Sequence, residues 1–112
     1  MGNSAIGGLK MEIINWLQEW YLKNCDGYWE HSFGIKIDTI DNPGWTVNID
    51  LNETSLENNP FDEVDVKRSN NDWFHCRVRN NVFQGSGGSR NLIDIIVIFK
   101  DWVIIENNKE MP

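Results

Sequence analysis

The stretch CDGYWEHSFGIKI, residues 25–37, concentrates side chains that are capable of chemistry. It holds the carboxylates of Asp26 and Glu30, the imidazole of His31 and the indole of Trp29 within a short distance along the chain. A carboxylate and an imidazole form a general acid–base pair when both reach the same atom. Glu30 and His31 are adjacent, however, and on the strand that this stretch predicts their side chains point to opposite faces. We therefore expect no catalytic residues here.

Metal coordination is the second chemistry that these residue types offer. The histidines and cysteines of the chain are His31, His75, Cys25 and Cys76. None of them forms the Cys-x-x-Cys or His-x-x-x-His spacing that metal sites commonly use. His75 and Cys76 are neighbours on a predicted strand, so their side chains face apart. We expect no metal and no other cofactor, with Cys76 as a buried thiol.

The glycine-rich stretch GSGGSR, residues 85–90, is a third candidate. It precedes a predicted helix, and backbone N–H groups at a helix N-terminus bind anions. It lacks the Lys-Ser or Lys-Thr pair of a phosphate-binding loop, however. The pattern favours a flexible loop over an anion site.

The elements that position these residues follow from the spacing of apolar side chains. Residues 11–24 repeat Ile13, Leu17 and Trp20 at helical spacing, which predicts an amphipathic helix. Alternation of apolar and polar residues predicts four strands, over residues 29–40, 45–51, 61–69 and 73–80. The turn DNPG between the first two strands predicts a hairpin.

Residues 91–105 are ambiguous, because their β-branched side chains favour a strand whereas their length favours a helix. Asn91 is followed three positions later by Asp94, a spacing typical of a helix start, so we predict a helix. The order helix, four strands, helix defines an α+β fold. We expect a four-stranded antiparallel meander sheet with the N-terminal and C-terminal helices packed on one face.

The bulk properties of the 112 residues fit one globular domain without a disulfide scaffold. We expect a flexible extension over residues 1–10, native or left by cloning, a single domain over residues 11–105 and a flexible tail over residues 106–112. No apolar run reaches the roughly 18 residues that a membrane span needs, and the chain shows no secretory leader. These features predict a cytoplasmic protein with free thiols and no membrane partner.

The charge of the chain narrows the class of partner. The net charge is −7, and residues 26–72 hold eleven Asp or Glu against three Lys or Arg, which leaves −8. Such a surface repels phosphates, so no nucleic-acid partner is expected. It attracts a basic protein surface by electrostatic steering. The simpler alternative is that the acids only keep the protein soluble.

Two of the six tryptophans stand beside acids near predicted turns. Trp29 precedes Glu30, and Trp73 follows Asp72. Aromatic side chains at the rim of a sheet, mixed with acids, are typical anchors of protein interfaces. The alternative is that both rings close the ends of the sheet over the core.

Taken together, the motifs resemble the Immunity protein 53 family. The resemblance rests on NWLQEWYLKNCDGYWEHSFGIKIDTIDNPGWTVNIDL, NNDWFHCRV, FQGSGG and NLIDIIVIFKDW in this order, and it covers about residues 14–102. Members of that family are small cytoplasmic proteins of bacterial polymorphic toxin systems. The resemblance implies a non-enzymatic immunity protein that binds and neutralises a cognate toxin domain by stoichiometric occlusion. A nuclease is one toxin class that the acidic surface would suit.

The resemblance and the acid–aromatic pattern together predict a partner-binding site. Its residues are Asp26, Trp29, Glu30, His31, Asp41, Asp72 and Trp73. One alternative is a small enzyme or ligand-binding domain that uses the region from Asp26 to His31. Another is that Asp26 caps and Trp29 fills the core, while binding uses the exposed sheet face around Arg77 and Arg79. The sequence leaves the toxin, the stoichiometry and the oligomeric state open.

Overall fold

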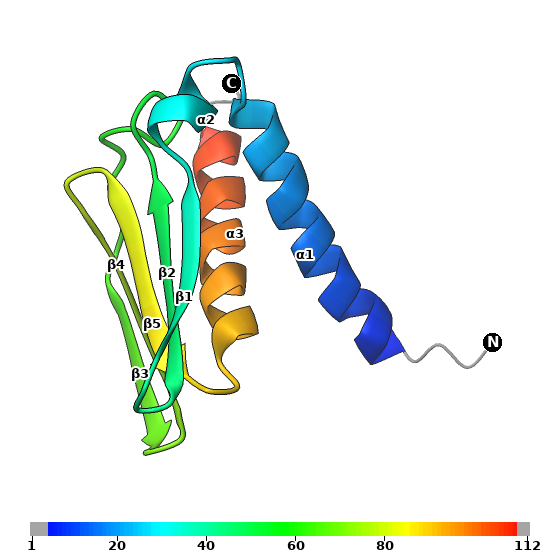
Figure 1. The fold of residues 1–112 in the computed structure, drawn as a ribbon, viewed down its shortest axis with the longest axis vertical. Helices are drawn as coiled ribbons and strands as arrows, with labels where there is room; N and C mark the ends of the chain where they lie inside the picture. The colour runs from blue at the N-terminus through cyan, green and yellow to red at the C-terminus, as the bar shows by residue number, and fades with distance from the viewer. Residues whose placement is uncertain (1–4, 110–112) are drawn as a thin grey trace.

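A computed structural model describes residues 5–109 of the protein. The elements are α1 (Ala5–Asn24), α2 (Trp29–Ser32), β1 (Ile35–Ile40), β2 (Gly44–Asp50), β3 (Val64–Ser69), β4 (Asp72–Arg79), β5 (Val82–Gly88) and α3 (Leu92–Lys109). The strands pair antiparallel in one sheet, and α1 and α3 lie on the same side of it (Figure 1). The predicted α+β fold, with terminal helices on one face of an antiparallel sheet, is confirmed.

Within residues 5–109 the sheet has five strands where the sequence predicts four, and its order is β1-β2-β5-β4-β3. The chain forms the hairpin β1–β2 and then the consecutive hairpins β3–β4–β5. β5 joins the two parts by pairing with β2, whereas a simple meander would place β2 beside β3. β1 and β3 are therefore the two edge strands.

The fifth strand comes from a stretch that the sequence predicts to be a loop. Its glycines produce no apolar alternation, which is the pattern by which a strand is recognised. A methyl group on Gly85 would lie 2.3 Å from Cγ2 of Ile95 in α3, and one on Gly87 would lie 3.2 Å from Cδ1 of the same side chain. The glycines therefore mark where α3 approaches the backbone of the sheet closely.

Residues 29–32 form the short helix α2, and strand β1 begins at Ile35. The prediction that this strand starts at residue 29 is therefore wrong. The carboxylate of Asp26 accepts the backbone N–H groups of Tyr28 and Trp29, both at 2.9 Å. These bonds satisfy donors that a helix start leaves without an intrahelical partner. A turn of helix therefore forms where the alternation of side chains suggested a strand.

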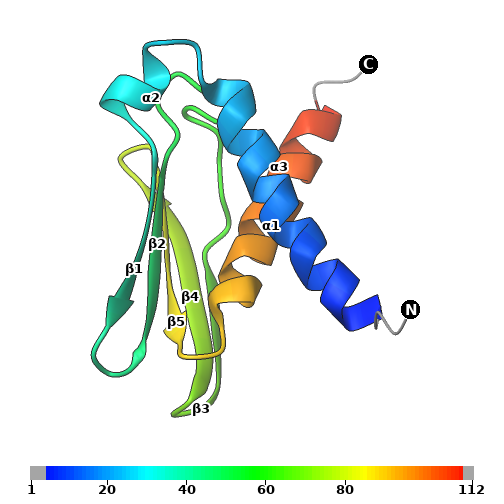
Figure 2. The same cartoon turned by 45° about the vertical axis from the view of Figure 1, so that its right-hand side comes forward.

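The ambiguous C-terminal segment is a helix, as predicted. α3 covers the inner face of the sheet, and α1 packs mainly against α3 (Figures 1 and 2). α1 begins at Ala5, before the predicted start at Met11, and α3 continues to Lys109. The helices thus overlap the extension and the tail expected from the sequence. The outermost parts of both, residues 1–4 and 110–112, lie outside the described residues.

A cluster of aromatic rings joins the sheet, α3 and α1. The ring centroid of Phe99 in α3 lies 5.0 Å from those of Trp20 in α1 and Phe83 in β5. Full burial of each such ring stabilises the fold by about 1.5–3 kcal/mol. Other buried members of the core are Ile13, Leu17, Trp29, Val47, Ile49, Leu51, Leu56, Phe74, Cys76, Ile95, Ile96, Trp102 and Val103.

Candidate partner-binding site

The seven residues predicted for the binding site fall into two groups at opposite ends of the sheet (Figure 1). One group lies in and just before α2, where β1 begins: Asp26, Trp29, Glu30 and His31. The other lies beside the β1–β2 turn and at the start of β4: Asp41, Asp72 and Trp73. The fold therefore does not assemble them into one site.

In the group at α2 the carboxylates hold the local fold. Glu30 accepts the backbone N–H groups of Asp26 at 2.9 Å and Gly27 at 2.7 Å. Asp26 in turn accepts those of Trp29 and Tyr28, and these bonds lower the pKa of the Asp26 carboxyl. The N-cap residue of α2, Tyr28, makes no side-chain capping bond of its own, so Asp26 supplies the acceptor at this helix start. Both carboxylates are thus engaged with backbone donors.

Trp29 belongs to the core. Its side chain is 1% exposed and packs edge-on against Trp20 and Tyr21, with centroids 5.9 and 5.8 Å away. Its indole N–H has no hydrogen-bond partner among the described residues. His31 is exposed on α2. This geometry agrees with the alternative in which Asp26 caps and Trp29 fills the core.

Asp72 belongs to a network at the start of α3. Arg68 donates from Nε and Nη2, both at 2.9 Å, to the two oxygens of its carboxylate. Asn91 donates to the same carboxylate at 2.9 Å and to Asp94 at 2.8 Å. The bonds from Arg68 and Asn91 lower the pKa of Asp72 to about 2. Asp72 thus links the β3–β4 hairpin to the start of α3. The third residue of this group, Asp41, is exposed in the β1–β2 turn.

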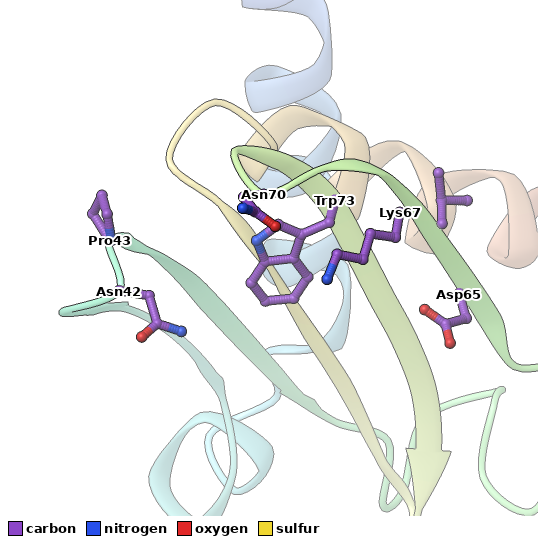
Figure 3. A pocket seen from close by; sticks show the side chains of 7 residues that line it. Asn42, Pro43, Asp65, Lys67, Asn70 and Trp73 are labelled. Carbon is purple, nitrogen blue, oxygen red and sulfur yellow. The ribbon is translucent and has the colours of Figure 1, made fainter.

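Trp73 lies on the open face of the sheet, the face that the helices leave uncovered. Its neighbour Phe74 faces the core, so Trp73 points the other way. The half-buried ring lines a hollow of about 440 Å³. Figure 3 shows the indole between the β1–β2 turn and strand β3. The hollow is lined by Asn42, Pro43, Asp65, Val66, Lys67, Asn70 and Trp73.

A second hollow, of about 290 Å³, lies further along the open face. Here Arg77 donates from Nε to Gln84 at 2.8 Å, and His75 is hydrogen-bonded to Glu63. The bond to His75 lowers the pKa of the Glu63 carboxyl. Sequence reasoning named Arg77 as a residue of the exposed face. It missed Gln84, because that residue fell in a predicted loop.

The side chains that could bind a metal or act as a nucleophile are not arranged to do so in the described part of the chain. Among residues 5–109, no three His, Cys, Asp or Glu side chains stand close enough together to hold a metal ion. Cys76 is buried as predicted, and burial raises the pKa of its thiol to about 12, so the reactive thiolate does not form at neutral pH. Within the same residues, no helix combines the length and the apolar character that crossing a membrane requires.

The fold and the open face define a small α+β domain that shields one side of its sheet and presents the other. The family model described as Immunity protein 53 matches residues 14–104. The chain therefore belongs to the Immunity protein 53 family, as its motifs indicated. No curated protein and no solved structure matches it.

Proposed function

We propose that the protein binds a cognate toxin domain and neutralises it by stoichiometric occlusion, using the open face of the sheet around Trp73. Membership of an immunity protein family supports the role. The observation that carries the site is the hollow beside Trp73, whose lining comes from the β1–β2 turn, β3 and the start of β4. An aromatic wall at a hollow is where a partner side chain is desolvated most completely.

The lining of this hollow suits a protein partner. Trp73 and Pro43 supply apolar surface, while Asp65, Lys67 and Asn70 supply charged and hydrogen-bonding groups. The centres of protein interfaces combine aromatic anchors with polar surroundings in this way. A toxin side chain that enters the hollow would contact the β1–β2 turn and the β3–β4 hairpin at once.

Of the other predicted residues, Asp41 lies in the turn that borders the hollow and belongs to the proposed surface. Asp26, Glu30 and His31 lie at the opposite end of the sheet and are left out of it. Trp29 is left out because its ring is buried. The proposed site thus keeps Trp73 and Asp41 of the second group and extends along the open face toward Arg77. Asp72 is left out, because its carboxylate bonds Arg68 and Asn91 at the start of α3.

The charge of the molecule favours a basic toxin. The net charge of −7 attracts positive surfaces over distances longer than a direct contact. A nuclease fits this requirement, because proteins that bind phosphates do so with Lys and Arg residues. Occlusion of such a surface requires neither turnover nor a cofactor. In this proposal it takes place in the cytoplasm, without a membrane or nucleic-acid partner.

The alternative of a small enzyme or ligand-binding domain at the Asp26–His31 region gains no support from the geometry. Both carboxylates accept backbone N–H groups, so a role as general base would compete with the bonds that start α2. The ring of Trp29 is buried, so it offers no surface to a substrate.

Replacing Trp73 with Ala removes the aromatic wall of the hollow. We expect the Kd of the toxin complex to rise at least ~30-fold, because loss of a hot-spot ring costs about 2 kcal/mol or more. The measurement is calorimetric titration with the toxin domain encoded beside the gene. Survival of cells that express both proteins is the second readout.

Tyr28→Ala is the matched control for this experiment. Tyr28 is an aromatic residue at the opposite end of the sheet, 54% exposed, and its loss should leave the Kd within about twofold. Thermal unfolding of both variants separates lost binding from lost folding. Equal losses of affinity in the two variants would exclude the site. Absence of any complex with the natural protein would exclude the function itself.

A further inference from the structure

β1 is an edge strand that little covers. In the part of the chain that the structure describes, one side of β1 has no neighbouring strand, and the four central residues of β1 are exposed. Ile37 is 42% exposed, although its register partner Val47 is buried. An edge of this kind is a template for a further strand unless something blocks it.

The register shows which backbone groups face this edge. The Asp50 N–H donates to the Gly34 carbonyl at 3.0 Å, so this pair belongs to the hydrogen-bonded class of antiparallel partners. The two classes alternate along the ladder. The N–H and C=O groups of Ile35, Ile37 and Thr39 therefore point away from β2, toward the free edge.

The N–H of Thr39 illustrates this direction, because it is not used by β2 and donates to the Asp38 carboxylate at 2.8 Å.

We propose that β1 pairs antiparallel with β1 of a second copy of this chain, about a two-fold axis at Ile37. Lys36 of each copy then faces Asp38 of the other. On the helix side of the joined sheet Ile37 meets its own counterpart, and Ile35 meets Thr39.

Charge selects this register over its neighbours. Keeping the helices of both copies on one side of the joined sheet requires the axis to pass through a residue. An axis at Lys36 would place two lysines opposite each other, and an axis at Asp38 would oppose two aspartates. The axis at Ile37 opposes unlike charges twice, which stabilises a strand pair, whereas directly opposed like charges destabilise it. The stretch IKIDTI is therefore complementary to itself.

The contact is small. A pair of six-residue strands buries less than the roughly 1,200 Å² of a standard stable interface, so the dimer should form and dissociate rapidly. The two open faces would join into one sheet of double width. The contact lies along β1, not in the hollow beside Trp73, so this inference does not rest on the proposed function.

Sedimentation equilibrium from ~10 μM to ~1 mM protein tests the proposal over the range in which small interfaces associate. The natural chain should show a monomer–dimer equilibrium. Lys36→Asp or Asp38→Lys alone opposes like charges on both sides of the axis and should raise the dimer Kd at least ~tenfold. The double variant K36D/D38K exchanges the charges and should return the Kd to within ~threefold of its natural value.

Lys67→Asp is the control, because Lys67 is an exposed lysine on the other edge strand, β3. It should leave the dimer Kd unchanged, and circular dichroism should show that every variant keeps its fold. A natural chain that stays monomeric throughout the range overturns the proposal. A double variant as weak as the single ones, or an equal effect of Lys67→Asp, overturns it as well.

Discussion

The carboxylate of Asp26 accepts two backbone N–H groups at the start of α2, and that of Glu30 accepts two more. The same stretch of sequence also holds a tryptophan and a histidine, and a binding site would contain the same residue types. A helix start needs such acceptors whatever the protein does. For a single residue, an acid beside an aromatic ring can therefore be explained by the local fold as well as by a binding function.

Two substitutions at Asp26 separate its role as acceptor from its charge. Asp26→Ala removes the acceptor and should lower the melting temperature at pH 7. Asp26→Asn keeps an acceptor oxygen that does not titrate and should lower it less. Differential scanning calorimetry of the two variants and the natural chain makes the comparison.

The pH dependence of the same variants has a definite sign. The folded-state pKa of Asp26 is lowered from 3.8, so its ionised form stabilises the fold above that pH. This contribution is lost as the pH falls through the folded-state value, and Asp72 adds the same trend down to about 2. The melting temperature should therefore fall from pH 6 to pH 2, less steeply for Asp26→Asn. Identical slopes of melting temperature against pH would contradict the role assigned to the Asp26 carboxylate.

At the scale of elements, β5 depends on α3 rather than on its own side chains. Gly85 and Gly87 leave no room between the strand and Ile95, so the helix lies almost on the backbone of the sheet. β5 also pairs with both β2 and β4, which makes it the centre of the sheet. A stretch that is typical of a loop by composition is thus the strand that joins the two halves.

Gly85→Ala tests this close approach. The added methyl group would stand 2.3 Å from Cγ2 of Ile95, so the helix or the strand must shift. We expect a loss of about 1–3 kcal/mol in the free energy of unfolding, measured by urea titration. Ser86→Ala, one position on and facing the open side, should change it by less than about 0.5 kcal/mol. Equal losses in the free energy of unfolding at the two positions would show that the close approach of α3 does not require a glycine at position 85.

At the scale of the whole molecule, charge acts over longer distances than any contact at Trp73. A net charge of −7 on a small domain creates a field that draws in a basic partner before the surfaces touch. The rate of encounter and the lifetime of the complex then depend on different features. Charge governs the first, and the packing of the hollow governs the second.

Salt separates these two contributions. Raising the ionic strength from ~0.05 M to ~0.5 M should lower the association rate constant with the toxin about tenfold or more. The dissociation rate constant should change much less. Stopped-flow fluorescence of the tryptophans measures both. An association rate that does not respond to salt would favour the simpler alternative, in which the acids only maintain solubility.

Features that depend on neighbours along the chain could be predicted from the amino-acid sequence. Apolar spacing predicted the helix that became α1, and length with the Asn91–Asp94 start predicted α3. Alternation of apolar and polar residues predicted four of the strands, and the DNPG turn predicted the β1–β2 hairpin. Together these elements specified the α+β class with helices on one face, and the motifs identified the family. Each of these signals lies within a window of a few turns or one hairpin, where periodicity and turn chemistry operate.

Which distant segments of the chain contact one another is known from the three-dimensional packing alone. The pairing of β2 with β5 joins strands that are far apart in the chain, and no local pattern encodes it. The same packing buries Trp29 against Trp20 and leaves Trp73 on the open face, although both stand beside an acid near a turn. Whether a ring is core or surface depends on which other elements cover it, and that is a property of the assembled layers.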